Sequence, residues 1–331
     1  MSPAREGTHR AARRGRSVLT PLAVVLACAT LLWMVVSGNR AEPTSFSPAP
    51  TASSAADPPA VPPESTEPTL SSTDAPTDVA RGADRQPAVG PTSAGVASAL
   101  AGALPEISGN LSVAILDPAG GEPVGYNTDR SYVTASIVKV DILAAFLLLT
   151  QQEHRALTTT ERATAAAMIE HSDNDAADTL WSAIGGAAGL RTANTALGLI
   201  ETEPTGLSWG LTRTTATDQV RLLDAITATD SPLGAGSRAY LADLMTSVAD
   251  DQTWGVATAA DPDTTPALKN GWLPRDATGL WVINSIGHIT HAGRPLLIAI
   301  LSDDQPSMPT GITQLEAVAR AAVPAVATAA N

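Results

Sequence analysis

The chain has 331 residues and a formal net charge of −13. Residues 1–40 carry six arginines and one glutamate, which leaves −18 for the other 291 residues. Such an acidic surface repels phosphate backbones, so the composition excludes nucleic acid as an expected partner. The single cysteine, Cys28, lies in an apolar segment, and one cysteine cannot form an intrachain disulfide.

The first 40 residues have the pattern of an export element. Four arginines at positions 10–16 precede a 19-residue apolar run at residues 18–36. That run is long enough to span a bilayer, and the preceding arginines predict a cytoplasmic N-terminus with an extracytoplasmic C-terminal domain. A cleaved signal peptide is the alternative, and it would make the protein secreted. We therefore assign residues 1–40 to a basic tail with a transmembrane anchor or signal peptide, and expect a single-pass cell-membrane protein.

Residues 41–95 have the composition of a linker. Ten prolines fall between residues 41 and 90, among many serines, threonines and alanines. Too few large apolar side chains are present to build a core, so we predict a disordered spacer. It would hold the following domain away from the membrane.

The pattern becomes globular from residue 96. A strand is predicted at 111–116 with a short partner near 124–126. Helices are predicted at 136–150 and 158–171, and Thr158 with Glu161 forms a capping box for the second. Further helices are expected at 175–184, 187–196, 217–228 and 237–248, strands at 267–271, 280–289 and 295–301, and a last helix from about 312. This order predicts an α+β domain over 96–331, a three-layer α/β/α arrangement with an antiparallel sheet flanked by a helical subdomain.

The first candidate for chemistry is the Ser-Ile-Val-Lys run at 136–139. Residues three apart on a helix share a face, so the Ser136 hydroxyl and the Lys139 amine can meet. A serine becomes a nucleophile when a base takes its proton; an amine of lowered pKa can do this, whereas arginine stays protonated. The chain has only two lysines against eighteen arginines. The structural alternative is a lysine that extends from an apolar helix into solvent.

The second candidate is Ser-Asp-Asn at 172–174, at the end of a predicted helix. Ser172 could relay a proton to a leaving group, and the Asn174 amide could orient a substrate carbonyl. The same tripeptide is also an ordinary helix end followed by an N-cap. Taken alone, this motif favours the structural interpretation.

The third candidate is the strand segment Lys269-Asn270-Gly271-Trp272. A strand lysine can hold a substrate carboxylate, and a glycine lets a substrate backbone come close. We predict that Asn270, Gly271 and Trp272 contact the substrate. The Trp272 and Ser136 N–H groups would together form an oxyanion hole. An edge lysine that prevents strand aggregation is the alternative.

In chain order, Ser-x-x-Lys, Ser-Asp-Asn and Lys-x-Gly match the signature of class A β-lactamases and penicillin-binding proteins. The chain resembles this superfamily of penicillin-recognising serine hydrolases over about residues 96–331. The segments at 168–176 and 184–186 also read like the class A pattern, and the chain's two lysines occupy the two lysine positions of the signature. The resemblance implies a β-lactamase/transpeptidase-like fold.

The resemblance also implies roles. Ser136 would be acylated by the substrate carbonyl, with Lys139 as base or proton relay. Ser172 would pass the proton to the leaving nitrogen, Asn174 would hold the substrate amide, and Lys269 would bind the substrate carboxylate and assist Ser172. The substrate would be a β-lactam or a peptidoglycan-type peptide amide, taken by a monomer without metal or organic cofactor.

Two departures bear on the deacylation step. Class A enzymes carry a glutamate in a Glu-Pro-x-x-Asn context on an omega loop. Glu203-Pro204 is the nearest counterpart here, but the asparagine is missing and the segment is roughly eight to ten residues shorter. Glu201 or Glu203 could position a water, or both could be surface charges. Asn270 also replaces the usual Thr or Ser. Acylation is therefore predicted, and efficient hydrolysis of the acyl-enzyme stays open.

Two other functions compete with this one. A catalytically impaired relative could bind cell-wall peptides or a partner without turnover. Gly-Leu-Ser208-Trp-Gly matches the nucleophile elbow of α/β-hydrolases, but no buried strand precedes it and no helix directly follows. His288 and His291, three apart on a predicted strand, would point to opposite faces, so no metal site is expected there.

Overall fold

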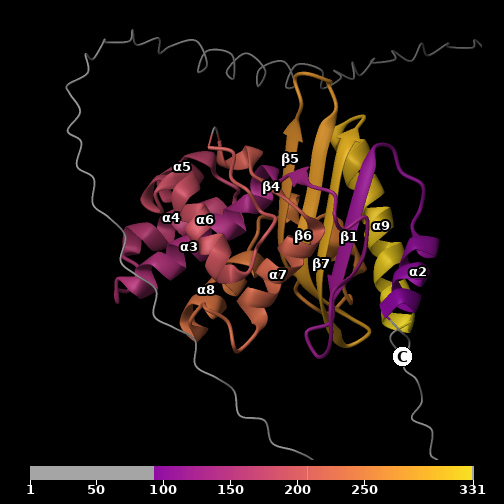
Figure 1. Cartoon of the computed structure of the whole chain (residues 1–331), viewed down its shortest axis with the longest axis horizontal. Helices are drawn as coiled ribbons and strands as arrows, with labels where there is room; N and C mark the ends of the chain where they lie inside the picture. Colours follow the sequence, from indigo (N-terminus) through magenta and orange to yellow (C-terminus); the bar gives the residue numbers. More distant parts are fainter. Residues whose placement is uncertain (1–92, 207, 330–331) are drawn as a thin grey trace, which may run out of the picture. The chain divides into compact units, whose positions relative to one another are not determined.

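A five-stranded antiparallel sheet runs through the middle of the domain (Figure 1). The computed structural model describes residues 93–206 and 208–329, so the predicted anchor at 18–36 lies outside the described residues. A separate two-stranded pair joins β3 to β4. The main sheet has the order β2-β1-β7-β6-β5, and the strands are β1 Asn110–Leu116, β2 Val124–Tyr126, β3 Tyr132–Val133, β4 Arg213–Thr214, β5 Ala267–Pro274, β6 Trp281–His291 and β7 Arg294–Gln305.

Helices cover both faces of the sheet. On one face, α2 (Ser93–Ala103) and α9 (Met308–Ala329) pack against each other (Figure 1). A helical subdomain lies on the other side and makes contact with the sheet through α7 and α8. It consists of α3 Val138–Gln152, α4 Thr159–Glu170, α5 Asn174–Ala183, α6 Gly186–Leu197, α7 Ala216–Thr227 and α8 Ala235–Thr246. The predicted α+β architecture with an antiparallel sheet is confirmed.

Strand β7 shows why the sheet needs cover on both faces. Side chains alternate along a strand, and here both sets are apolar. Leu297, Ala299 and Leu301 pack into the core under the helical subdomain. Leu296 and Ile298, with Ile300, pack into the second core under α2 and α9. A strand that is apolar on both faces reads as a continuous hydrophobic run and is stable only between two layers.

Helix α2 was not predicted. It begins at Ser93, inside the range assigned to the linker, and its small residues resemble the preceding segment in composition. Val96 and Leu100, four residues apart, are its buried side chains. This i, i+4 pair is the local signal that distinguishes the helix from the Pro-rich stretch.

The predicted helix at 136–150 starts differently. Residues Ala135–Ile137 form a 3₁₀ turn, η1, and α3 begins only at Val138. The reason is Ala135, whose φ of +49° is left-handed and cannot belong to an α-helix. Ala135–Gln152 is long and apolar enough to cross a membrane, but 78% of it is buried inside the domain. It is therefore the central core helix.

Candidate active site

Ser136 is the one partly exposed residue in the otherwise buried stretch 132–148. The turn that presents it is fixed by two hydrogen bonds. The Asn284 side chain on β6 donates to the carbonyls of Val133 (2.8 Å) and Thr134 (3.0 Å). Ala135, next to Ser136, has a positive φ. A non-glycine residue keeps such a conformation only where its surroundings hold it, and such strain is frequent at functional sites. The fold therefore places a serine hydroxyl at the surface on a rigid, strained turn.

Gly271 on β5 lies directly against this turn. A Cβ at Gly271 would come within 2.7 Å of the Ser136 nitrogen and 2.8 Å of the Ile137 nitrogen. Real Cβ atoms do not approach backbone this closely, so only glycine fits at this position. The neighbour of Gly271 in the structure is the Ser136 turn, and the predicted contact of Gly271 with a substrate stays a prediction.

Lys139 points from the first turn of α3 to the α4–α5 junction. Its Nζ donates to the Ser172 carbonyl (2.6 Å), the Ser172 Oγ (3.1 Å) and the Asn174 Oδ1 (2.9 Å). Ser172 has a φ of +55°, another left-handed non-glycine residue. This conformation turns both of its oxygens to the same amine.

Lys269 reaches the same hydroxyl from the sheet. Its Nζ lies 3.1 Å from Ser172 Oγ, 3.1 Å from the Asn270 carbonyl and 3.5 Å from Gln252 Oε1. The side chain is completely buried. Its three acceptors use all the donors of an ammonium group, so the geometry favours assistance to Ser172 over direct contact with a substrate carboxylate.

Burial sets the electrostatics of the two amines. Burial lowers the pKa of Lys139 to about 8, although Asp173 and Asp178 oppose this shift. Burial and the nearby Lys139 lower the pKa of Lys269 to about 7. Taking an ammonium group out of water favours its neutral form, and two amines that face one hydroxyl disfavour each other's charge. A neutral amine is the form that can accept a proton from serine.

The predicted contact between the Ser136 hydroxyl and the Lys139 amine is not made. Within the described residues, Ser136 Oγ has no hydrogen bond, and the amine is directed to Ser172 and Asn174. The structure thus joins Lys139, Ser172, Asn174 and Lys269 in one network and places Ser136 beside it.

Asn270 requires a correction. Its side chain is completely buried and donates to the carbonyls of Gln252 (2.7 Å) and Trp254 (3.1 Å). The predicted substrate contact is wrong for this arrangement, because the amide ties β5 to the turns η3 (Asp250–Gln252) and η4 (Gly255–Ala259). Trp272, on the same face of β5, packs against Trp254 with ring centroids 6.1 Å apart.

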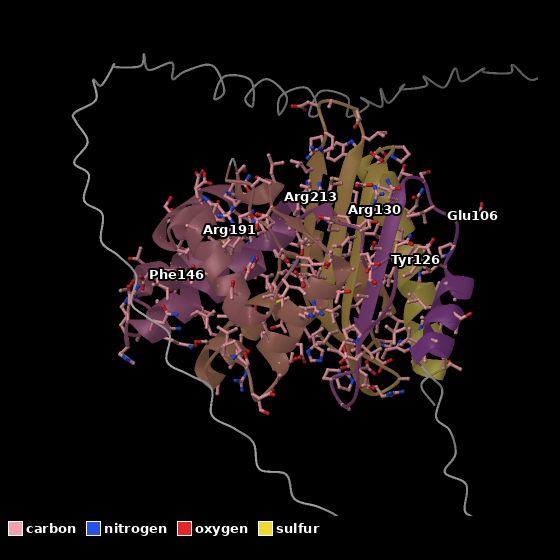
Figure 2. All side chains as sticks on the ribbon, in the orientation of Figure 1. Glu106, Tyr126, Arg130, Phe146, Arg191 and Arg213 are labelled. Atoms are coloured by element: carbon pink, nitrogen blue, oxygen red, sulfur yellow. The ribbon has the colours of Figure 1, made fainter. Side chains whose placement is uncertain are left out.

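Glu203 is held at the surface. Its exposed carboxylate pairs with Arg191 of α6 at 2.7 Å, and Arg191 also donates to the Pro204 carbonyl. Arg191 and Arg213 are labelled in Figure 2. The backbone of Glu203 pairs with Arg213, which in turn donates to Ser131. This arrangement favours the surface-charge interpretation of Glu203.

Three residues that the sequence analysis missed contribute to the site. Asn284 holds the Ser136 turn, and Gln252 accepts from Lys269. The ring of Trp209, in the turn η2 (Trp209–Leu211), lies over Lys139 Nζ at 4.8 Å from the ring centroid. A lone asparagine inside the apolar strand segment 280–289 was the available signal for Asn284; the other two depend on tertiary placement.

A buried carboxyl lies on the same helix as Lys139. Asp141 is fully buried, and neither of its oxygens has a hydrogen-bond partner among the described residues. The Oδ1 of buried Asn194 also lacks one there. Burial raises the pKa of Asp141 to about 8, and the nearby Asp218 adds to the rise. A protonated carboxyl is therefore the form that this interior favours at neutral pH.

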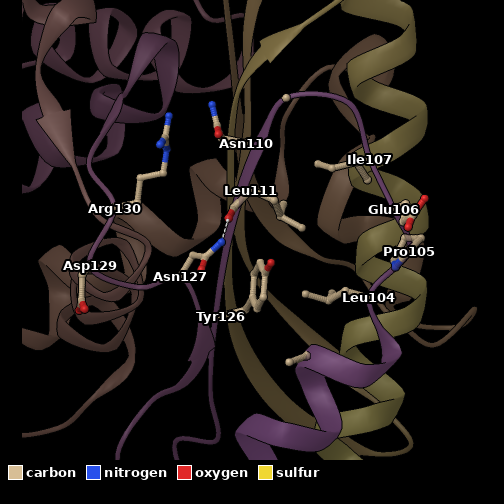
Figure 3. Close-up of a pocket in the computed structure, with 12 residues that line it drawn as sticks. Leu104, Pro105, Glu106, Ile107, Asn110, Leu111, Tyr126, Asn127, Asp129 and Arg130 are labelled. Carbon is tan, nitrogen blue, oxygen red and sulfur yellow. Dashed lines mark hydrogen bonds between the residues drawn. The ribbon is translucent and has the colours of Figure 1, made fainter.

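A pocket of about 760 Å³ opens elsewhere, between the end of α2 and the strands β1 and β2 (Figure 3). Tyr126, Asn127 and Arg130 lie along it, and Asn127 donates to the Leu111 carbonyl. None of the four predicted catalytic residues lines it. The candidate active site is therefore located by the lysine network, and this larger pocket lies apart from it.

The fold and this arrangement define a protein of the β-lactamase class. The sequence profile described as the Beta-lactamase enzyme family matches residues 149–326, more than half of the chain. The chain belongs to this family. The matched range includes Ser172 and Lys269 and begins after Ser136 and Lys139.

Solved structures agree on the fold. The TLA-1 extended-spectrum β-lactamase aligns with a TM-score of 0.63 at 18% identity, over 70% of this chain and 98% of that one. A β-lactamase from Burkholderia vietnamiensis aligns with a TM-score of 0.59 at 23% identity, over 69% and 95%. At these identities the likeness shows the fold alone.

Two mycobacterial relatives carry a name that describes a lipoprotein, LppW. The proteins from Mycobacterium tuberculosis and Mycobacterium bovis are each 30% identical over 172 residues, 49% of this chain and 54% of theirs. The chain thus spans about half the length of the curated relatives it matches.

Proposed function

We propose that this protein is an extracytoplasmic serine acyl-transfer hydrolase that acts on β-lactam or peptidoglycan-type amides through an ester on Ser136. One observation carries the proposal: Ser172 Oγ lies 3.1 Å from each of two lysine amines with lowered pKa, beside a partly exposed serine on a strained turn. This combination supports proton transfer between a nucleophile and a leaving group, which a purely structural role does not require.

In the proposed step, the Ser136 Oγ attacks the amide carbonyl carbon. Its proton passes to the neutral Lys139 amine and returns through the Ser172 hydroxyl to the leaving nitrogen as the C–N bond breaks. Lys269 keeps Ser172 oriented. The N–H groups of Ser136 and Trp272, brought together by the close contact at Gly271, would stabilise the negative carbonyl oxygen.

The proposed location is outside the cytoplasmic membrane, with the protein as a monomer anchored by residues 18–36. The arginines ahead of that run and the lipoprotein name of the LppW relatives support it. Protease treatment of intact cells tests this: the C-terminal domain should be cleaved without permeabilisation, and protection would contradict the location.

A second candidate is a cell-wall peptide binding protein with impaired catalysis. It is favoured by Glu203, whose carboxylate is engaged with Arg191, and by Lys269, whose donors are all used within the protein. It predicts that amide substrates bind without covalent attachment.

The test is to incubate the full-length chain with benzylpenicillin and follow its intact mass. We expect an adduct of one penicillin that peptide mapping assigns to Ser136. Ser136→Ala should abolish it, and Ser208→Ala, a matched change at the serine of the hydrolase-elbow sequence, should retain it. An adduct that persists in Ser136→Ala would refute the site, and no adduct in the wild type would favour the binding protein.

A further inference from the structure

The segment 202–214 places an aromatic ring on the lysine amine of the site. Trp209 is half-buried, and its ring centroid lies 4.8 Å from Lys139 Nζ. Lys139 itself is buried, with its amine enclosed by Ser172, Asn174 and this ring. The indole therefore covers one side of the amine, next to its hydrogen-bonded partners.

The ring is fixed in place from two directions. Its Nε1–H donates to Asp178 Oδ1 on α5 at 2.6 Å. The turn η2 that carries it is bound to the segment before Ser136, because the Thr134 N–H donates to the Thr212 carbonyl at 2.8 Å. The turns η1 and η2 also pack against each other. A side chain held at both its tip and its backbone is a built part of the site.

We propose that Trp209 is a positioning residue that covers the Lys139 amine and excludes water from it and from an acyl group on Ser136. This inference rests on the proposed function. An ester on Ser136 is hydrolysed only when water reaches its carbonyl carbon with a base nearby, and a fixed apolar ring beside the turn opposes both. The cover therefore gives the acyl-enzyme a long lifetime.

Several charged groups face the covered amine. Asp173 and Asp178 act on it from the α4–α5 junction and α5, and Lys269 acts on it from β5. The indole ties up one oxygen of Asp178, so removing the ring also frees that carboxylate. Hydration of the amine and a freer Asp178 both favour the charged form of Lys139. Loss of the cation–π contact with the ring acts in the opposite direction, and we expect the first two effects to be larger.

The two lysines make a direct test possible. Full-length protein labelled with ¹³C at lysine Cε should give two lysine signals, from Lys139 and Lys269. Trp209→Ala should raise the titration midpoint of Lys139 by about one pH unit. Trp209→Phe keeps a ring over the amine and should stay near the wild type. The matched control is Trp281→Ala, which removes a half-buried indole from the start of β6.

The second readout is the lifetime of the penicillin adduct on the full-length chain. Trp209→Ala should shorten it about tenfold, whereas Trp209→Phe and Trp281→Ala should not. An unchanged titration midpoint of Lys139 in Trp209→Ala would overturn the proposal that Trp209 covers the amine. This test does not require that the wild type forms an adduct. An unchanged lifetime in that variant would overturn the exclusion of water and leave Ser136 acylation standing. Failure of the wild type to form an adduct is a failure of the proposed function.

Discussion

Two neighbouring regions of this domain differ in how the structure holds their polar side chains. The lysine network lies on regular elements: Lys139 on α3, Lys269 on β5, and Ser172 at the fixed junction of α4 and α5. The segment 201–214 is mostly irregular, and its carboxylate Glu203 is bound to Arg191 at the surface. In the proposed function, the groups that form the ester lie on packed elements, whereas the carboxylate considered for its hydrolysis lies on an irregular, exposed segment.

The chemical demands of the two regions explain this difference. A lysine acts as a base only when burial keeps it neutral, which requires helices and a sheet around it. A surface loop tolerates length and sequence changes more readily than the elements that it connects. In this chain Trp209 of the loop lies over the Lys139 amine. Among the described residues, no carboxylate of the loop contacts Lys139, and Glu203 is bound to Arg191.

The largest expected effect tests the lysine network. Lys139→Arg should lower the rate of Ser136 acylation by about 10²–10⁴, because a guanidinium stays protonated and cannot accept the serine proton. Quenched intact-mass time courses with benzylpenicillin measure this rate. Lys139→Met, uncharged and of similar length, should be equally slow. Wild-type rates in both variants would remove Lys139 from the chemistry.

The next effect tests the contact between the sheet and the serine turn. Gly271→Ala places a Cβ within 2.7 Å of the Ser136 nitrogen, so it should displace the turn and destabilise the protein by about 1–3 kcal/mol. Acylation should fall with it. Denaturant unfolding gives the first quantity. Gly236→Ala on α8, where nothing lies within 4 Å of the new Cβ, is the control and should not be destabilised.

Asp141 should make the stability of the protein depend on pH. Its pKa is raised from 3.8 to about 8, so the folded state holds a proton that the unfolded state releases between these values. Its contribution to stability is therefore present below pH 4 and is lost as the pH rises toward 8. Asp141→Asn should lose less stability than the wild type between pH 5 and pH 8, as thermal unfolding would measure. Equal losses would contradict a protonated Asp141.

The smallest expected effect concerns Glu203. An exposed ion pair contributes about 0–1 kcal/mol, so Glu203→Gln should change the unfolding free energy by no more than this. The penicillin adduct of Glu203→Gln should have a lifetime within about twofold of the wild type. Loss of a general base would instead lengthen this lifetime by about 10²–10⁴. A long extension would return Glu203 to the deacylation step and weaken the contrast between the two regions.

The sequence predicted the order of elements and the network residues because the relevant signals are local. Thr158 and Glu161 form the capping box that was predicted from their spacing. Lys139 and Lys269 stand out in a chain with no other lysine. The left-handed Ala135 was not predictable, because alanine has no intrinsic preference for that conformation and tertiary contacts impose it.

The errors have physical causes as well. Asn270 was assigned to the substrate together with Lys269, although neighbours on a strand point to opposite faces. Which face meets the helical subdomain depends on the packing of the whole sheet. Trp209 was missed for a similar reason: its partner Lys139 is 70 positions away in the sequence, and no local pattern reports such a contact.

The most direct test of the central claim, a neutral lysine amine that accepts the serine proton, is the pH dependence of acylation. The rate of adduct formation on the full-length chain would be measured between pH 6 and pH 10. The pKa of Lys139 predicts a rate that rises through a midpoint of about 8 and then levels, with this limb lost in Lys139→Met. A rate that is flat across this range, or that falls as the amine loses its proton, would contradict the account.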